Sequence, residues 1–159
     1  MELLDRFIRY VKIYTTSDPG SQTVPTTARQ LDLAKVLCED LKEIGIEDAR
    51  ISETGYVYGS IPASSGCESA PALGLIAHMD TAPAFSGENV DPQIIPNYDG
   101  KNVKLGSSGC ELDAEMFPWL SSLAGRTLIT TDGMTLLGAD DKAGVTAVIC
   151  AVEKVVLKD

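Results

Sequence analysis

The sequence predicts an α/β fold in which helices flank a mixed β-sheet. Two segments near the N-terminus carry apolar residues at helical spacing, short strand-like segments follow them, and an apolar helical segment comes last. Helices and strands that interleave along a chain are typical of α/β layers. The length of 159 residues fits a domain with one sizeable core.

The first two elements are predicted to be amphipathic helices. Over residues 2–14, apolar side chains recur every three to four positions. The second helix is expected between Thr27, which forms a capping-box pattern with Gln30, and Gly45, a residue type that commonly ends helices. Cys38 lies in the apolar stripe of this helix, so we expect it to pack in the core.

Strands are predicted where short runs of β-forming residues lie between turn residues. The run 72–77 is apolar throughout, as expected of a strand that is buried on both faces. Asp99-Gly100 predicts a hairpin turn between the strands on either side of it. In the irregular stretch that follows, Trp119 is expected to anchor a core. The predicted strands are residues 49–52, 56–61, 72–77, 94–98, 101–105, 127–130 and 135–137.

The final apolar segment, which follows Asp141, is predicted to be a helix that continues to Lys158-Asp159. In an α/β layer such a helix crosses over to another strand, and this sequence contains no strand after it. We therefore expect the chain to be part of a longer domain.

Composition narrows the class of partner. Lys and Arg number 13 against 23 Asp and Glu, a net charge of −10, which argues against nucleic acid and against an anionic membrane surface. No apolar run approaches the roughly 18 residues of a membrane span. The four cysteines are scattered, and the chain starts without the basic and apolar regions of a signal peptide, which favours free thiols in the cytoplasm.

His78 and Asp80 form the first candidate site. They follow the predicted buried strand directly, at the end where ligands gather in α/β sheets. Side chains two positions apart on an extended chain point to the same side, so the carboxylate can support an imidazole that binds a metal. The alternative is an ordinary hydrogen-bonded histidine beside a turn aspartate.

Asp140 and Asp141 form the second candidate site, at a predicted strand-to-helix junction. Aspartate is a favoured N-cap residue, which explains one of the two, and Asp141 fits that role. Two adjacent carboxylates repel each other unless a cation lies nearby. A divalent metal at Asp140 would supply one, and Lys142 is another.

With these residues in place, the chain resembles the peptidase T family, which are tripeptide aminopeptidases of the dinuclear-zinc aminopeptidase and carboxypeptidase superfamily. The resemblance runs through the whole chain. The segments that carry it are residues 4–11, 74–81, 86–95, 125–133 and 135–144.

The resemblance implies a site built on His78, Asp80 and Asp140. In the family, the residue at His78 binds one zinc, the residue at Asp140 bridges two zinc ions, and the residue at Asp80 supports the histidine and counts as catalytic. The bond between the residues matching Asp140 and Asp141 is typically cis. The zinc ions activate a water for attack on the peptide, and a glutamate beyond Asp159 serves as general base.

The resemblance also implies that residues 1–159 are the N-terminal part of the catalytic domain. The lid domain, the C-terminal part of the catalytic domain and the remaining ligands are absent from this chain. The intact protein is then expected to be a zinc-dependent aminopeptidase that releases the N-terminal residue of tripeptides. Association into a homo-oligomer is compatible with this expectation. This chain alone is expected to be inactive and to bind zinc weakly or not at all.

Two other functions compete with this one. The chain could be complete and serve as a non-catalytic binding or structural module, as the absent base and ligands would suggest. It could also belong to a related amidohydrolase that acts on acylated amino acids. The peptidase-T-like segments around residues 89–92 and 130–133 argue against the amidohydrolase.

Overall fold

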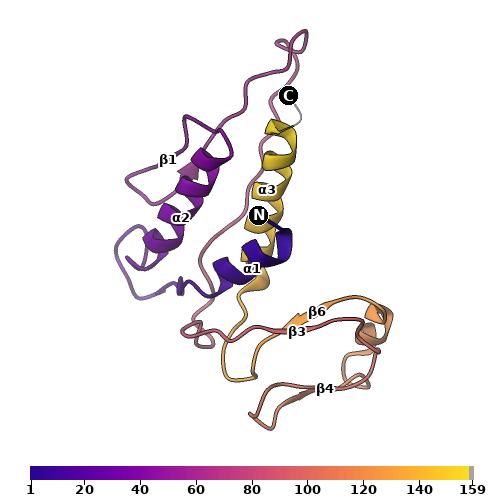
Figure 1. Cartoon of the computed structure of the whole chain (residues 1–159). Helices are drawn as coiled ribbons and strands as arrows, with labels where there is room; N and C mark the ends of the chain where they lie inside the picture. Colours follow the sequence, from indigo (N-terminus) through magenta and orange to yellow (C-terminus); the bar gives the residue numbers. More distant parts are fainter. Residues whose placement is uncertain (158–159) are drawn as a thin grey trace. The chain divides into compact units, whose positions relative to one another are not determined.

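A computed structural model describes residues 1–157, which form helices and short strands as expected of an α/β chain. They divide into two compact units. The first comprises Met1–Pro83 and the segment from Gly138 onward, and the second comprises Ala84–Leu137. Figure 1 labels helices and strands of both units and colours them along the sequence.

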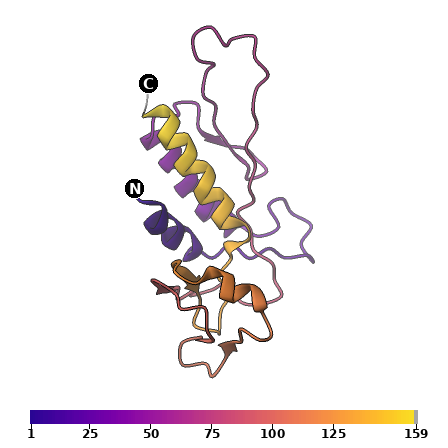
Figure 2. The same ribbon diagram turned by 90° about the vertical axis from the view of Figure 1, so that its right-hand side faces the viewer.

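The first unit is built on helices α1 (Leu3–Val11), α2 (Gln30–Glu43) and α3 (Ala139–Val156). All three predicted helices are present, and the predicted end of the third at Lys158-Asp159 lies outside the described residues. Figure 2 shows α2 behind α3 with α1 beside them. Each turns an apolar stripe inward, and burial of that surface drives their packing. The core they share includes Cys38, as predicted, and its other members are Tyr10, Leu33, Leu37, Leu41, Ile44, Ile46, Ala49, Val145 and Ile149.

Polar contacts also join these helices. Nη1 of Arg6, on α1, donates to Oε2 of Glu153 on α3 at 2.8 Å. The hydroxyl of Tyr10 donates to Oδ2 of Asp40 on α2 at 2.5 Å, inside the core. The buried charge of Arg6 is thus paired with Glu153, and the buried charge of Asp40 is paired with Arg9. Buried charges need such partners.

The predicted capping box of α2 is wrong. The N-cap residue is Arg29, and no side chain caps this end of the helix. The Thr27 hydroxyl instead donates to the backbone carbonyl of Thr16 at 2.9 Å, so a tertiary contact takes the group that the cap would have used. At the other end the prediction is confirmed, since Gly45 follows the helix with a φ of +100°.

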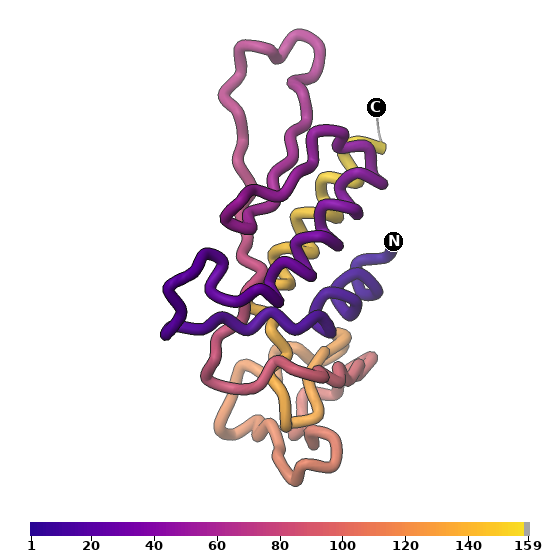
Figure 3. Tube along the Cα trace, turned by 90° about the vertical axis from the view of Figure 1, so that its left-hand side faces the viewer, coloured from indigo at the N-terminus to yellow at the C-terminus, as the bar shows by residue number. Residues whose placement is uncertain are grey.

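Strands β1 (Arg50–Ile51) and β2 (Val57–Tyr58) confirm the strands predicted at 49–52 and 56–61, although they are shorter than expected, and they pair antiparallel. The prediction of a buried strand over 72–77 is wrong. This run has no strand partner among the described residues, and Leu73 and Ile76 are 85% and 94% exposed. It returns from the long excursion that Figure 3 shows after β2. A central strand needs a neighbour on each edge, and the rest of the described chain supplies none here.

The second unit contains β3 (Gln93–Ile95), β4 (Val103–Lys104), β5 (Glu111–Leu112), the 3-10 helix η1 (Pro118–Leu123) and β6 (Leu128–Thr130). β3 pairs with β6 and β4 pairs with β5, both antiparallel. The hairpin predicted across Asp99-Gly100 is therefore wrong, because the strands on either side of that turn pair elsewhere. Residues 135–137, predicted as a strand, form none.

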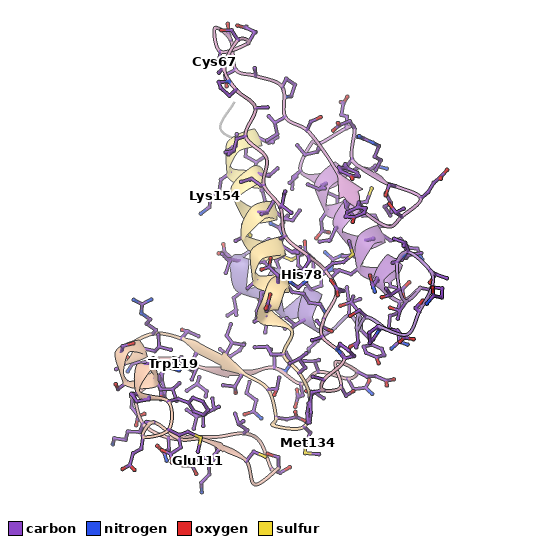
Figure 4. The ribbon with its side chains drawn as sticks, turned by 180° about the vertical axis from the view of Figure 1, so that it is seen from behind. Cys67, His78, Glu111, Trp119, Met134 and Lys154 are labelled. Atoms are coloured by element: carbon purple, nitrogen blue, oxygen red, sulfur yellow. The ribbon has the colours of Figure 1, made fainter. Side chains whose placement is uncertain are left out.

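Trp119 does not anchor the core of the second unit, contrary to prediction. Its side chain is 58% exposed on η1, while the next residue, Leu120, is fully buried with Tyr98 and Val103. A 3-10 turn faces only part of its residues inward, and at this turn the inward position belongs to Leu120. Figure 4 labels Trp119 on η1.

The predicted mixed sheet is not present in residues 1–157. The strands there form three separate antiparallel pairs, and parallel pairing is limited to an isolated bridge between Thr16 and Thr81. No described helix is long and apolar enough to cross a membrane. Within the same residues all four cysteines are unpaired, as expected from their scatter along the sequence.

Candidate metal centre

The structure brings His78, Asp80 and Asp140 together in the first unit. Nε2 of His78 lies 3.0 Å from Oδ1 of Asp140. Nδ1 of the same ring lies 3.1 Å from the backbone carbonyl oxygen of Asp80 and 3.2 Å from its Oδ1. Each ring nitrogen therefore faces an oxygen of one of the two predicted aspartates. Figure 4 shows His78 beside α3, on the extended segment that leads away from Cys67.

The contacts of His78 determine its protonation. Partial burial by itself lowers the pKa of the ring, but the hydrogen bonds to Asp140 and to the Asp80 carbonyl, with the charges of both carboxylates, outweigh it. The pKa of His78 is therefore raised above its ordinary value of 6.5. The site attracts positive charge, which is the electrostatic requirement for a cation.

Asp140 reaches the site through an irregular start of α3. Gly138, the N-cap, has a φ of +71°, and Asp140 and Asp141 depart from helical φ and ψ values. The peptide bond between Asp140 and Asp141 is cis, as the resemblance implied. The Asp140 side chain is 95% exposed, so its carboxylate is free to meet a ligand from solution.

Asp141 has the capping role predicted for one member of the pair. Its Oδ1 accepts a hydrogen bond from the backbone N–H of Gly144 at 3.0 Å, three residues into the helix. The two adjacent aspartates thus have different tasks. Asp141 accepts a hydrogen bond from a backbone N–H in the first turn of the helix, and Asp140 faces His78.

No pattern of residue types in the sequence indicates the contacts that hold the two halves of the site. Thr81, next to Asp80, pairs with the segment after α1 through its bridge to Thr16. Lys142, which the sequence offered as a cation near the two aspartates, is buried instead and donates from Nζ to the carbonyl oxygen of Ile13 at 2.6 Å. These contacts join segments far apart in sequence, and each uses at least one backbone atom, which any residue type carries.

The donor set fits a zinc ion in kind. A neutral imidazole with its proton on Nδ1, held by Asp80, presents the Nε2 lone pair beside the Asp140 carboxylate, and both are donors that zinc accepts. The set is small, however. No group of three or more histidine, cysteine or acidic side chains suited to a metal exists within residues 1–157.

No protein-family model matches the chain. Its sequence is similar to proteins named peptidase T from several bacteria. A protein named peptidase T from Geobacillus kaustophilus is 51% identical over 151 residues, which is 94% of this chain. One from Desulfitobacterium hafniense (strain Y51) is 52% identical over 151 residues, and one from Halothermothrix orenii is 50% identical over 153. The chain spans 36–37% of the length of these relatives.

Proposed function

Because this chain is homologous to peptidase T over 94% of its length, we propose that the intact protein is a zinc-dependent aminopeptidase that releases the N-terminal residue of tripeptides. The observation that carries the proposal is the contact of 3.0 Å between Nε2 of His78 and Oδ1 of Asp140. It joins an imidazole and a carboxylate, two side chains that hold zinc in hydrolases, on an exposed surface that a peptide can reach.

The residues of this chain have distinct roles in the proposed site. His78 and Asp140 would hold zinc, of which the intact enzyme would have two ions. Asp80 would fix the orientation and the tautomer of His78 through Nδ1. Bound zinc would supply the Lewis acidity that polarises a peptide carbonyl and lowers the pKa of a water molecule.

We also propose that residues 1–159 are the N-terminal part of a catalytic domain whose remaining part, together with a lid domain, lies elsewhere in the longer protein. The chain spans about 36% of its relatives, which leaves room for both. The exposed apolar run 72–77 supports the proposal, since its composition suits a strand covered by further residues. The missing zinc ligands and the general base would come from there, and this chain alone would be inactive.

The proposal is tested in the full-length protein. After removal of metal, added zinc should restore tripeptide cleavage to the wild type and not to Asp140→Ala. Asp32→Asn changes an exposed aspartate on α2 and should leave this cleavage unchanged. Retained cleavage in the Asp140→Ala protein would reject the assignment. Aminopeptidase specificity requires that a tripeptide is cut and its N-acetyl form is not, whereas preference for an acylated amino acid would indicate the related amidohydrolase.

A non-catalytic binding module remains the second candidate for the chain by itself. It is favoured by the absence of a three-residue metal cluster within residues 1–157. Zinc titration followed by calorimetry separates the candidates. A full-length protein that binds zinc only with His78 and Asp140 intact supports the enzyme, and one that binds none supports the module.

The proposed setting is the cytoplasm, with a small peptide as the substrate. Four unpaired cysteines suit a reducing compartment. The net charge of −10 disfavours nucleic acid and anionic membrane as partners. Association into a homo-oligomer is compatible with this assignment and is tested by the mass of the full-length protein in solution.

A further inference from the structure

Lys142 is a buried cation that has no carboxylate partner in the described part of the chain. It is 2% exposed, and its Nζ donates to the carbonyl oxygen of Ile13 at 2.6 Å. Burial lowers the pKa of Lys142 to about 8, because a charged amine loses its hydration there. An apolar side chain of the same length would fill this space without that cost. The hydrogen bond is therefore what the lysine adds.

The acceptor of this bond belongs to a segment that also touches the His78 side of the site. Residues 13–17 follow α1, and backbone hydrogen bonds of 3.3 and 3.0 Å join this segment to Thr81. The hydroxyls of Thr16 and Thr81 also lie 3.1 Å apart. Segment 13–17 is thus bound on one side by Lys142 and on the other by the chain that carries His78.

The alkyl stem of Lys142 packs at the same junction. A Cβ atom placed on Gly138 would lie 2.8 Å from Cγ2 of Thr81 and 3.8 Å from Cδ of Lys142. The lack of a side chain at Gly138 lets Thr81 approach the start of α3 closely. Lys142 therefore packs near the contact between Thr81, in the segment that carries His78, and Gly138, at the start of the helix that carries Asp140.

We propose that Lys142 is a positioning residue for the candidate metal centre. It fixes the start of α3, and with it Asp140, against segment 13–17, which in turn holds the chain that carries His78. The catalytic meaning of this inference rests on the proposed function, but the contact between His78 and Asp140 can be followed without zinc or peptide.

The experiment follows the ring signals of His78 by NMR in the 159-residue chain at pH 5. At this pH the ring is protonated whether its pKa is 6.5 or higher, so protonation differences do not contribute. The Asp140→Ala variant, which cannot make the contact, gives the His78 chemical shifts expected when the contact is lost. We expect Lys142→Met to move the His78 signals more than half of the way toward those shifts. Thr16→Val, which weakens the same link, should move them in the same direction.

Thr146→Val is the matched control. Thr146 is 1% exposed, and its hydroxyl donates to the Lys142 carbonyl within α3 at 2.7 Å. We expect this variant to lose thermal stability and to keep the His78 signals in place. The proposal is overturned if folded Lys142→Met keeps the wild-type signals, or if Thr146→Val moves them as far.

Should Lys142→Met fail to fold, unchanged His78 signals in Thr16→Val overturn the proposal, and signals moved toward the Asp140→Ala position support it. None of these outcomes depends on cleavage of a peptide. A failure here therefore leaves the aminopeptidase proposal to its own test, and rejection of that activity leaves the link between Lys142 and the His78–Asp140 contact standing.

Discussion

Nε2 of His78 lies 3.0 Å from Oδ1 of Asp140, although 62 positions separate the two residues in the sequence. Their side chains are 53% and 95% exposed. An ion pair so open to water stabilises a fold by little, because solvent screens the charges. The contact therefore matters more for what the two side chains can bind than for the stability of the chain.

Replacing Asp140 with Asn should lower the pKa of His78. The Asp140 carboxylate attracts the charged ring and accepts its hydrogen bond. The neutral amide of asparagine can still accept a hydrogen bond but has no charge to attract the ring. NMR titration of the ring protons measures the change. Asp32→Asn, which removes an exposed carboxylate that pairs with Lys35, should leave the titration unaltered. A His78 titration that does not respond to Asp140→Asn would mean that the two side chains do not meet in solution.

The sequence indicated the members of the site better than it indicated the contacts that assemble it. His78 and Asp140 stand where a predicted strand ends and a predicted helix begins, and their side-chain types limit what they can do there. The Lys142–Ile13 contact joins a side-chain amine to a backbone carbonyl, and the Thr16–Thr81 contact joins two common hydroxyls. Such contacts leave no pattern of residue types, so only the folded chain reveals them.

Helices were predicted more accurately than strands for a related reason. A helix satisfies its own backbone hydrogen bonds, so an apolar stripe such as that of α2 is enough to locate it. A strand depends on its neighbour. The run 72–77 has the composition of a buried strand without a neighbour among the described residues, and the strands beside Asp99-Gly100 pair with partners other than each other.

Glu153→Gln should remove a pH-dependent part of the stability. The hydrogen bond from Arg6 lowers the pKa of Glu153 below its ordinary value of 4.5. As the pH falls, Glu153 is therefore protonated in the unfolded chain before it is protonated in the folded chain. The stabilisation is therefore fully present above the ordinary pKa and is lost as the pH falls through the lowered one. We expect the wild type to exceed Glu153→Gln by about 1–2 kcal/mol in free energy of unfolding at neutral pH.

That difference should shrink as the pH falls from about 6 to about 3, as measured by urea unfolding at each pH. Glu39→Gln, which changes an exposed glutamate of α2, serves as the control and should show no comparable trend. A difference between wild type and Glu153→Gln that stays constant over this range would contradict the ion pair with Arg6.

Ile76→Ser should leave the free energy of unfolding of this chain within about 0.5 kcal/mol of the wild type. Ile76 is 94% exposed, so its removal takes away no packing. The same change should reduce aggregation, because exposed apolar segments with free backbone groups pair between molecules. Leu37→Ala, in the core of the first unit, should cost about 2–5 kcal/mol by comparison. A loss of that size in Ile76→Ser would show that the run is covered in solution.

Gly144→Ala should destabilise the chain, although alanine in a helix is ordinarily about 1 kcal/mol better than glycine. A Cβ atom on Gly144 would clash with the carboxylate of Asp141. The carboxylate would have to leave the backbone N–H that it caps, and a lost cap costs up to about 2 kcal/mol, which exceeds the gain from alanine by about 1 kcal/mol. We expect a net loss of about 1 kcal/mol, measured by urea unfolding.

The sign of the Gly144→Ala effect should reverse once the carboxylate is gone. In an Asp141→Ala background the three atoms nearest to the new methyl group, all of them in the Asp141 carboxylate, are gone, so Gly144→Ala should stabilise by the ordinary propensity difference. Ala147→Gly, at an exposed position one turn further on, should cost about 1 kcal/mol in both backgrounds and so excludes a general effect on α3. If Gly144→Ala has the same sign with and without Asp141, then Asp141 does not cap the helix. Asp140 and Asp141 would then have no separate roles, and both carboxylates would be available to a metal.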